Sequence, residues 1–543
     1  MTTDRASWSA PTPDWVTSGA EVVRGLDLLG LRAPAMRIGN SLLDGITTIT
    51  PRVRYMSFLT WLTWLYWRRA GTDTRTAYLA FARRIEAAIA LGNIAHDPSA
   101  VGLVGAEGSR EALADPDGVP LDLKVVQLAA NAYSVPAQQL GLLALRGDTQ
   151  VPHLTDARGL PLAQTVDDVV RTTTLGRRLS DGELPERVPI DELREFGGAA
   201  QIRTFPEVER TALLDAIVPR SPDGAVERCR VASYGAFLAR AAQGQERREY
   251  RALLRCAGQA DRQLPAVFDE ILDGWSLYLV RDLLAVAHEF ALAALTAVLP
   301  RPGDGGPRWV APADAVAKAL GDPSMSALLR DLGLLGPAES WDTLTFDELR
   351  ERVLGATSDG VITERGLRRW RRGLNEERLI AAVRTLRLGA PVALPVAWLL
   401  AERRAGPGAR EHDAPFGALS PPREGLSRLG FEQVVLPALE RFDRTQPRLP
   451  DVVAELLSWT VEQHLRTAWS RLAVDRRKDV ARLLADGTTW AYRADFPAGQ
   501  TDSRLSQLDH WLRQLGLLGD DGVTSEGHAV LDRCLAALAG GRA

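Results

Sequence analysis

Lysine is scarce in this chain of 543 residues, and arginine supplies almost all of its positive charge. Lys124, Lys318 and Lys478 are the only lysines among 65 basic side chains. Together with the abundant alanine, this bias indicates a GC-rich genome rather than selection for phosphate binding. The formal net charge of -4 supplies no global field that would attract a polyanion, so nucleic-acid contact would require a local basic patch.

Cysteine is equally rare. Cys229, Cys256 and Cys534 lie far apart in the sequence and include no Cys-x-x-Cys pair. A disulfide framework and a structural zinc site both need cysteines in closer groups. We therefore expect a reducing, cytoplasmic environment, no bound metal and no cofactor.

Long uncharged hydrophobic runs are missing as well. The most apolar stretch extends from Trp275 to Leu299. Four ionisable side chains lie near its middle, namely Arg281, Asp282, His288 and Glu289. Such side chains are costly inside a bilayer, so the stretch predicts a buried helix of a protein without membrane association. Residues 1–14 lack the basic and apolar parts of a signal peptide and are expected to form a short arm.

The sequence contains no familiar catalytic signature, such as a Gly-x-Ser-x-Gly elbow, a Walker A loop or a His-Glu-x-x-His helix. The stretch from Gly102 to Gly108 holds three glycines, but it lacks the Gly-x-Gly pair and the preceding strand of a dinucleotide-binding loop. A catalytic site would therefore have to be assembled from ionisable residues that are distant in sequence. The candidates are Asp282, His288, Glu289, Glu462 and His464.

The composition is that of a globular protein, with 45% hydrophobic and 25% charged residues. The length requires several cores, and stretches rich in Pro, Gly and Arg separate the helical patterns. The expected domains are 16–175, 205–300, 308–404 and 429–543. Strand-like runs are few and short, so the sequence predicts a mainly α, multi-domain protein.

An aromatic-rich segment predicts a core helix between residues 51 and 70. Its large side chains recur at roughly helical spacing: Tyr55, Phe58, Trp61, Trp64, Leu65, Tyr66 and Trp67. Such rings bury large areas, which favours a core helix over a surface that stacks on a base or another ligand. A second helical pattern, from Arg75 to Ala90, is expected to pack on it.

The sequence Leu-Gly-Leu-Leu occurs three times, at residues 140–143, 332–335 and 515–518. Each copy ends a helical pattern and is followed by a Leu-Thr or Val-Thr step and a second helical pattern. This order predicts a helix, a tight turn, a short β-hairpin and another helix. It resembles the winged-helix module, and the resemblance implies a module that binds DNA in some proteins and other proteins elsewhere.

The third copy provides a candidate face for reading DNA. The helix before it carries Arg504, Gln507, His510 and Arg513 opposite its apolar face. In a DNA-binding winged helix, the helix before the wing enters the major groove, where arginine and glutamine contact base edges. Acidic residues nearby oppose phosphate contact, namely Asp509, Asp520 and Asp521. The sequence therefore favours a structural or protein-binding role for this face and leaves DNA contact open.

The densest basic cluster lies in the third predicted domain, around Trp370. It consists of Arg365, Arg368, Arg369, Arg371 and Arg372. Arginines around an aromatic ring can neutralise phosphates and stack on a base. Glu364, Glu376 and Glu377 flank the cluster, so a solvated helix face with salt bridges is the favoured interpretation.

These features together predict a non-catalytic binding component of a bacterial multi-protein assembly. A protein partner is expected, and double-stranded DNA is a second candidate partner. Analogy of architecture suggests genome maintenance or defence against mobile elements as the setting. Two alternatives stay open: a transcriptional regulator that binds DNA, and an enzyme whose site is assembled from the distant ionisable residues.

Overall fold

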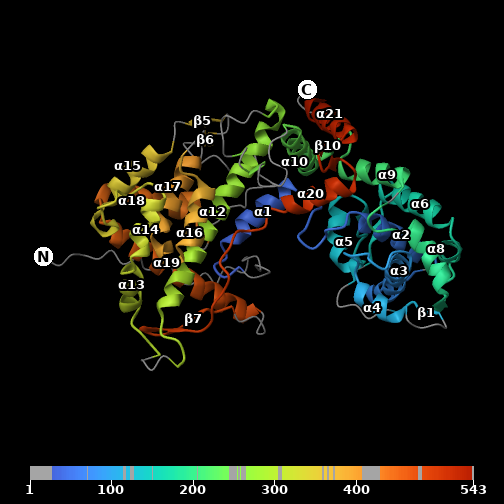
Figure 1. Ribbon diagram of the computed structural model, residues 1–543, viewed down its shortest axis with the longest axis horizontal. Helices are drawn as coiled ribbons and strands as arrows, with labels where there is room; N and C mark the ends of the chain where they lie inside the picture. Colours follow the sequence, from blue (N-terminus) through green and yellow to red (C-terminus); the bar gives the residue numbers. More distant parts are fainter. Residues whose placement is uncertain are drawn as a thin grey trace. The chain divides into compact units, whose positions relative to one another are not determined.

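The computed structural model groups the chain into two compact units, each built from several stretches of sequence (Figure 1). Unit 1 comprises Met1–Ile38, Leu254–Gln263 and Leu272–Thr501. Unit 2 comprises Gly39–Leu253, Leu264–Ile271 and Asp502–Ala543. The residues that the structure describes are 27–69, 71–113, 118–122, 128–149, 151–204, 206–243, 253–254, 257, 264–303, 308–357, 360–363, 366–370, 373–405, 428–474 and 480–540.

This grouping differs from the four consecutive segments expected from the sequence. The segment 16–175 divides after Ile38, and the segment 205–300 changes unit after Leu253, Gln263 and Ile271. The segment 429–543 divides between Thr501 and Asp502. Glycine- and proline-rich stretches mark local breaks in the chain, but they carry no information about which distant segments share a core.

Unit 1 is mainly helical. Its helices are α1 (Arg32–Leu42, in this unit to Ile38), α12 (Asp269–Val298, in this unit from Leu272), α13 (Pro312–Leu320), α14 (Ser324–Asp331), η3 (Trp341–Thr343), α15 (Phe346–Ala356), α16 (Glu376–Thr385), η4 (Arg387–Val392), α17 (Ala393–Ala405), η7 (Phe431–Val435), α18 (Leu436–Thr445) and α19 (Leu449–Val474). Two antiparallel hairpins complete the described part of the unit, β5 (Gly360–Ile362) with β6 (Arg368–Trp370), and β7 (Leu483–Asp486) with β8 (Thr489–Tyr492).

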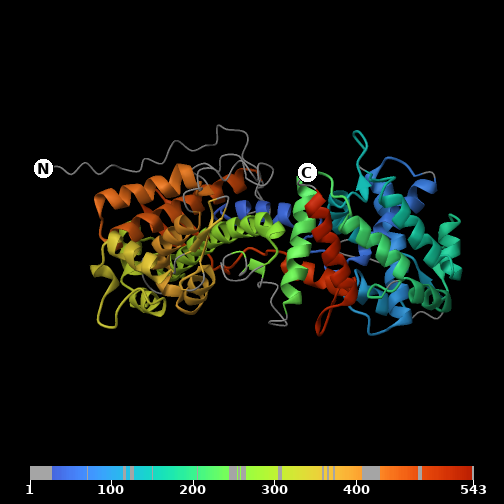
Figure 2. The ribbon, with the colours of Figure 1, turned by 90° about the horizontal axis from the view of Figure 1, so that it is seen from above.

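The core of unit 1 forms where α12, α17 and α19 meet (Figures 1 and 2). Phe290 of α12, Trp398 of α17 and Leu457 of α19 are buried in one hydrophobic cluster. The prediction of a buried helix around residues 275–299 is confirmed, because even three of its four central ionisable residues are buried, with Asp282 3%, His288 0% and Glu289 1% exposed.

Unit 2 is also mainly helical. Its helices are α2 (Arg54–Arg68), α3 (Arg75–His96), α4 (Ala106–Ala112), α5 (Ala129–Gln139), α6 (Gly159–Val170), α7 (Thr174–Ser180), α8 (Ile190–Ala199), α9 (Glu207–Ile217), α10 (Gly224–Ala242), η2 (Ala266–Phe268), α20 (Leu505–Gln514) and α21 (Ser525–Ala539). Its strands form three two-stranded antiparallel pairs, β1 (Val119–Pro120) with β4 (Arg187–Val188), β2 (Leu143–Ala144) with β3 (His153–Leu154), and β9 (Leu518–Gly519) with β10 (Gly522–Val523).

The aromatic helix α2 lies in the core of unit 2, as predicted. Tyr55, Phe58 and Trp61 are buried, and α2 packs against α3, α5, α6 and α9. The rings of Tyr66 on α2 and Tyr78 on α3 meet edge to face, with centroids 5.2 Å apart. The expected packing of the second aromatic helix on the first is therefore confirmed.

All three Leu-Gly-Leu-Leu sequences end a helix with the same hydrogen-bond pattern. The glycines at 141, 333 and 516 have φ values of 69°, 74° and 73°, a left-handed conformation that favours glycine. The amide of the leucine after each glycine donates back to a carbonyl in the last helical turn, at 2.8–2.9 Å. This is a Schellman motif, which satisfies carbonyl groups that the end of a helix leaves without partners.

The hairpin after the turn forms in two of the three places. Leu143 pairs with Leu154 after the first copy, and Leu518 pairs with Val523 after the third. After the second copy the chain enters η3 and then α15, whose first turn is capped by Thr345 and Glu348. The prediction of a hairpin directly after every copy is thus wrong for the second, because a capping box there starts the next helix without one.

A threonine joins the two helices in the first and third copies. The hydroxyls of Thr155 and Thr524 donate to the carbonyls of Gly141 and Gly516 at 2.6 and 2.7 Å. Each hydroxyl also accepts the amide of a glycine in the following helix, Gly159 or Gly527, at 3.0 Å. A Cβ on Gly159 would lie 2.0 Å from the carbonyl oxygen of Leu142, and one on Gly527 would lie 2.1 Å from that of Leu517. The following helix therefore needs glycine where it meets the turn.

We expect Gly527→Ala to lower the free energy of unfolding of unit 2 by about 1–3 kcal/mol or more, because the added methyl group would overlap the Leu517 carbonyl. Urea denaturation followed by tryptophan fluorescence measures the change. Gly540→Ala, at the other end of α21, is the control, because a Cβ there meets no atom within 4 Å. Equal stability of the two variants would contradict this account of the turn.

Candidate functional site

The predicted DNA-reading face of α20 contacts the chain's own backbone. Arg504 donates to the carbonyl of Ile46 at 2.8 Å, and Gln507 donates to that of Thr48 at 3.2 Å. Two further side chains of this helix bind the same stretch: Trp511 donates to Thr50, and Gln514 donates to Pro51 and accepts from Val53. These side chains thus bind the loop of residues 46–53 in unit 2, mostly through its carbonyl groups.

Of the other two predicted residues on this helix, one is paired and one is exposed. Arg513 forms an ion pair with Asp509 at 3.0 Å and donates to the carbonyl of Gly519. The side chain of His510 is exposed to solvent. Gln507, His510 and Arg513 therefore share helix α20, whereas Arg504 lies directly before its first residue with a φ of 62°. His510 is the one of the four whose side chain has no described partner within the chain.

The second basic cluster lies on a strand and not on a helix, which corrects the predicted helix face. Arg368 and Arg369 belong to β6, whereas Arg365, Arg371 and Arg372 lie outside the described residues. Arg369 forms an ion pair with the buried Asp273 at 2.6 Å. The helical interpretation failed because pairing with β5, a contact formed across a turn, fixes the conformation here.

Trp370 in this cluster is buried and not available to stack on a base. The guanidinium group of Arg404 lies 3.7 Å from its ring centroid. Arg404 also forms a buried ion pair with Glu376, at 2.6 Å between Nε and Oε1. Glu376, which was expected to balance the cluster itself, is therefore paired with an arginine of α17 instead.

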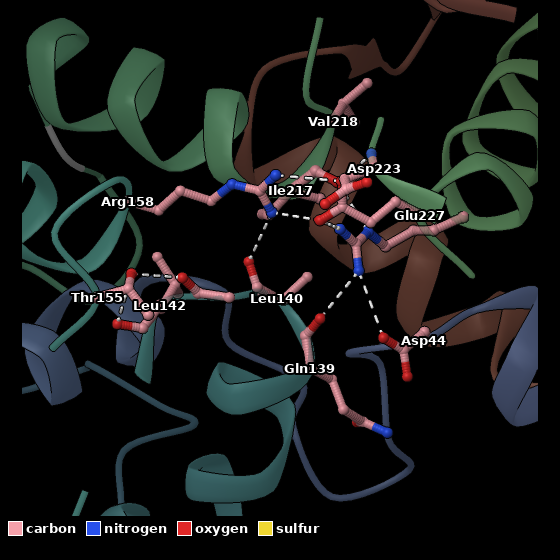
Figure 3. A network of polar contacts seen from close by, with 12 residues as sticks. Asp44, Gln139, Leu140, Leu142, Thr155, Arg158, Ile217, Val218, Asp223 and Glu227 are labelled. Atoms are coloured by element: carbon pink, nitrogen blue, oxygen red, sulfur yellow. Dashed lines mark hydrogen bonds and ion pairs between the residues drawn. The ribbon is translucent and has the colours of Figure 1, made fainter. Parts of the chain in front are cut away.

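A network of polar contacts in unit 2 surrounds the first Leu-Gly-Leu-Leu turn (Figure 3). Arg158 donates to the carbonyl of Leu140 at 3.2 Å and binds the carboxylate of Glu227 with both terminal nitrogens. Burial acts to raise the pKa of Glu227, but the hydrogen bond from Arg158 is among the interactions that hold this pKa below its usual value. Glu227 also accepts the backbone amide of Asp223 at 2.8 Å.

Arg230 extends the network into the interior, where its side chain is fully buried. It donates to the carbonyls of Ile217 and Gln139 at 3.0 and 3.2 Å, which lie at the ends of α9 and α5. It also approaches Asp44 and Glu227, each at 3.4 Å. Burial raises the pKa of Asp44 to about 6 even though Arg230 lowers it. One guanidinium group therefore holds the ends of two helices together.

His288 of the candidate catalytic group has a structural environment. The Nε1–H of Trp398 donates to its Nε2 at 3.0 Å, and its Nδ1 lies 2.7 Å from the hydroxyl of Thr460, which donates to the carbonyl of Leu456. This chain of donors requires a neutral ring with the proton on Nδ1. Burial lowers the pKa of His288 to about 3, which agrees with a neutral ring.

His464 and Glu289 both fasten the segment that contains residues 28–32. The Nδ1–H of His464 donates to the carbonyl of Leu28 at 3.0 Å, and its Nε2 accepts the amide of Arg482 at 2.9 Å. Glu289 forms a bidentate ion pair with Arg32. Burial raises the pKa of Glu289 to about 7, although Arg32 lowers it.

Asp282 and Glu289 share a face of α12, as their spacing predicts. Asp282 accepts the amide of Thr501 at 2.6 Å, and Glu289 accepts that of Gly499 at 3.3 Å. Glu462 is instead 53% exposed at its side chain and lies 3.8 Å from Arg466. Within the part of the chain that the structure describes, no three His, Cys, Asp or Glu side chains form a group that could hold a metal ion.

The roles of several residues that organise these sites were not predicted from the sequence. The Leu-Thr and Val-Thr steps include Thr155 and Thr524, but the hydrogen bonds of their hydroxyl groups were not anticipated. With Gly159 and Gly527 these threonines repeat the spacing Thr-x2–3-Gly, a signal that comparison of the copies could have found. Arg230 carries a weaker signal, because Glu227 lies three residues before it on α10 but Asp44 and Gln139 come from distant segments of the chain.

Comparison with protein-family models, with curated proteins and with solved structures finds no match to this chain. Among the described residues, no helix has the length and apolar character needed to cross a membrane.

A pH-dependent loss of stability is expected from the buried histidine at 464. Burial lowers its pKa to about 4, against about 6.5 in an unfolded chain. Between these two pKa values His464 binds a proton in the unfolded state but not in the folded state. Acidification from pH 6.5 to 4 therefore removes about 1.4 kcal/mol of the free energy of unfolding per pH unit through this group. Urea denaturation of the protein and of His464→Gln across this range measures the effect.

The difference between the two proteins isolates His464 from Glu289, whose raised pKa gives a slope of opposite sign below pH 7. We expect the stability advantage of the unmodified protein to be constant above pH 6.5 and to shrink below it. An advantage that does not change with pH would show that His464 is not held neutral.

Proposed function

We propose that the chain is a non-catalytic binding component of a multi-protein assembly and that unit 1 docks a protein partner. The proposed docking element is the sequence of α13, α14, α15 and the hairpin β5–β6. A winged helix has three helices followed by a hairpin, and α13, α14, α15 and β5–β6 follow the same order. We therefore propose a winged-helix fold for this element.

The observation that carries the proposal is the apolar character of the end of this element. Leu354 near the end of α15 is 42% exposed, and Val361 and Ile362 on β5 are 53% and 51% exposed. Exposed apolar side chains close together in the chain are typical of protein interfaces. Among the described strands β5 pairs only with β6, so its other edge supports the addition of a partner strand.

The charges on α15 support a protein partner over a nucleic acid. Glu348 and Glu351 are exposed on this helix, where a DNA-binding winged helix would present basic side chains. Arg350 is paired with Glu402 and Asp443, and Arg352 is paired with Glu339. Carboxylates on this surface would repel phosphate groups.

We also propose, by analogy with other proteins of this architecture, that the protein acts in the bacterial cytoplasm in genome maintenance or defence. The candidate catalytic residues support a non-catalytic role for the protein. His288, His464 and Glu289 hold backbone segments and buried neighbours in place.

The docking proposal is tested by Val361→Glu combined with Ile362→Glu. Both side chains are exposed, so we expect unfolding stability to change by less than about 0.5 kcal/mol while the partner is lost. Affinity capture from extracts of the native cells, with quantification of co-purified proteins, measures the loss. The matched control is Val208→Glu on α9, where the valine is 67% exposed. An identical set of captured proteins for all three forms would contradict the proposed surface.

The regulator alternative is tested separately at α20. Since its polar face binds the chain's own backbone, we expect no salt-dependent binding of duplex DNA and no effect of His510→Glu combined with Arg513→Glu. Fluorescence anisotropy at low and moderate salt measures this, with Arg228→Glu on α10 as an exposed control. Steep salt-dependent binding that only the α20 variant loses would favour the regulator.

A further inference from the structure

The hairpin of β5 and β6 has two outer edges, and its hydrogen bonds show which backbone groups face them. The amide of Thr363 donates to the carbonyl of Leu367 at 2.8 Å, where the two strands meet the connecting turn. In an antiparallel ladder, hydrogen-bonded pairs alternate with pairs that are not hydrogen-bonded. The next pair, Ile362 with Arg368, is therefore of the second kind. Its backbone groups point away from each other, towards the two outer edges.

An arginine side chain covers the outer edge of β6, and no described residue pairs with the outer edge of β5. Nη1 of Arg404 donates to the outward carbonyl of Arg368 at 3.0 Å. On β5 the outward groups belong to Gly360 and Ile362, and no described residue forms a hydrogen bond with them. Two amides and two carbonyls at alternate residues are the groups with which an added strand pairs.

The guanidinium group of Arg368 has no partner among the described residues. Its neighbour Arg369 is bound to Asp273 of α12 at 2.6 Å, which fixes the hairpin on this helix. Arg368 is half-buried, and its Nε is buried without a hydrogen-bond partner. A charged donor that is partly removed from water without an acceptor costs free energy, so the group favours a ligand with a negative charge.

The side chain of Arg368 crosses β5 at Gly360. A Cβ on Gly360 would lie 2.8 Å from Cγ of Arg368, so the missing side chain makes room for the arginine stem. Arg368 starts on β6, but its Cγ already lies against a residue of β5. Neighbouring strands are about 4.8 Å apart, a distance that the remaining atoms of an arginine side chain can span. A strand added to β5 would therefore lie within reach of this guanidinium group.

We propose that the outer edge of β5 binds an extended protein segment that carries a carboxylate side chain, and that Arg368 binds this carboxylate. The inference rests on the proposed docking function of unit 1 and names the chemistry of the partner there. Gly360 and Ile362 supply the backbone hydrogen bonds, and Arg368 selects the carboxylate through a charge-assisted hydrogen bond. The exposed side chains of Val361 and Ile362 beside the arginine favour a protein segment over a nucleic acid.

The test uses the full-length chain and three synthetic heptapeptides of sequence Thr-Val-Thr-X-Thr-Val-Thr with blocked ends, where X is Glu, Gln or Lys. Isothermal titration calorimetry at low salt measures their dissociation constants. We expect the Glu peptide to bind about tenfold more tightly than the Gln peptide, as one charge-assisted hydrogen bond provides, and the Lys peptide to bind most weakly. Binding should also slow hydrogen exchange at the amides of Gly360 and Ile362, which face the outer edge of β5.

Two variants of Arg368 test the role of its charge. Arg368→Met keeps an apolar side chain and should remove the preference for Glu over Gln. Arg368→Glu should reverse the order and favour the Lys peptide, a gain that an unfolded variant cannot show. Arg387→Glu, at an exposed arginine of η4 in the same unit, is the control and should leave the preference for Glu unchanged.

A Glu peptide that binds no more tightly than the Gln peptide would overturn the inference, and so would a preference that Arg368→Met retains. Binding of a short single-stranded oligonucleotide that depends on Arg368, without binding of the Glu peptide, would overturn it in favour of a phosphate ligand. The capture experiment with Val361→Glu and Ile362→Glu separates the two proposals. Loss of captured proteins without a preference among the peptides removes only the acidic partner, whereas unchanged capture removes the docking surface and this inference with it.

Discussion

The structure depends on buried and half-buried arginine side chains that bind carbonyl groups at the ends of helices. Every helix ends with carbonyl groups that lack partners in the helix, and burying them without partners is costly. Arg230 binds the ends of α5 and α9, Arg54 binds the carbonyl of Ala199 at the end of α8, and Arg210 binds that of Leu515 after α20. The planar group with five donors suits this role, which a lysine with three donors on one nitrogen would fill less well.

Buried and half-buried arginines in this chain also form ion pairs with carboxylates, and these ion pairs join segments that are distant in sequence. Arg54 binds Glu209, and Arg158 binds Glu227 across 69 residues of sequence. Removing one partner of such a pair leaves a buried charge, so the contacts are expensive to break even where they add little net stability. Each such arginine must lie close to both a helix end and a carboxylate. This requirement limits which helices can be neighbours within a unit.

The sequence predicts those parts of the fold that depend on local rules. Each Leu-Gly-Leu-Leu turn could be placed because a left-handed glycine after a helix follows from backbone sterics. The buried helices α2 and α12 could be placed because apolar side chains recur at helical spacing. The arginines around Trp370 were misread as helical, since the pairing of β5 with β6 overrides the local preference.

The roles of individual polar residues depend on contacts that no local rule supplies. Arg504, directly before α20, looks in sequence like a residue that reads DNA, yet it donates to the carbonyl of Ile46, 458 positions away. His288 looks like a catalytic group, yet Trp398 and Thr460 hold it neutral. A surface arginine and a buried one are indistinguishable in sequence, and in this chain most described arginines are bound by its own carbonyls and carboxylates. Arginine content therefore reflects the internal organisation of this chain, and a count of arginines in the sequence is weak evidence for a nucleic-acid partner.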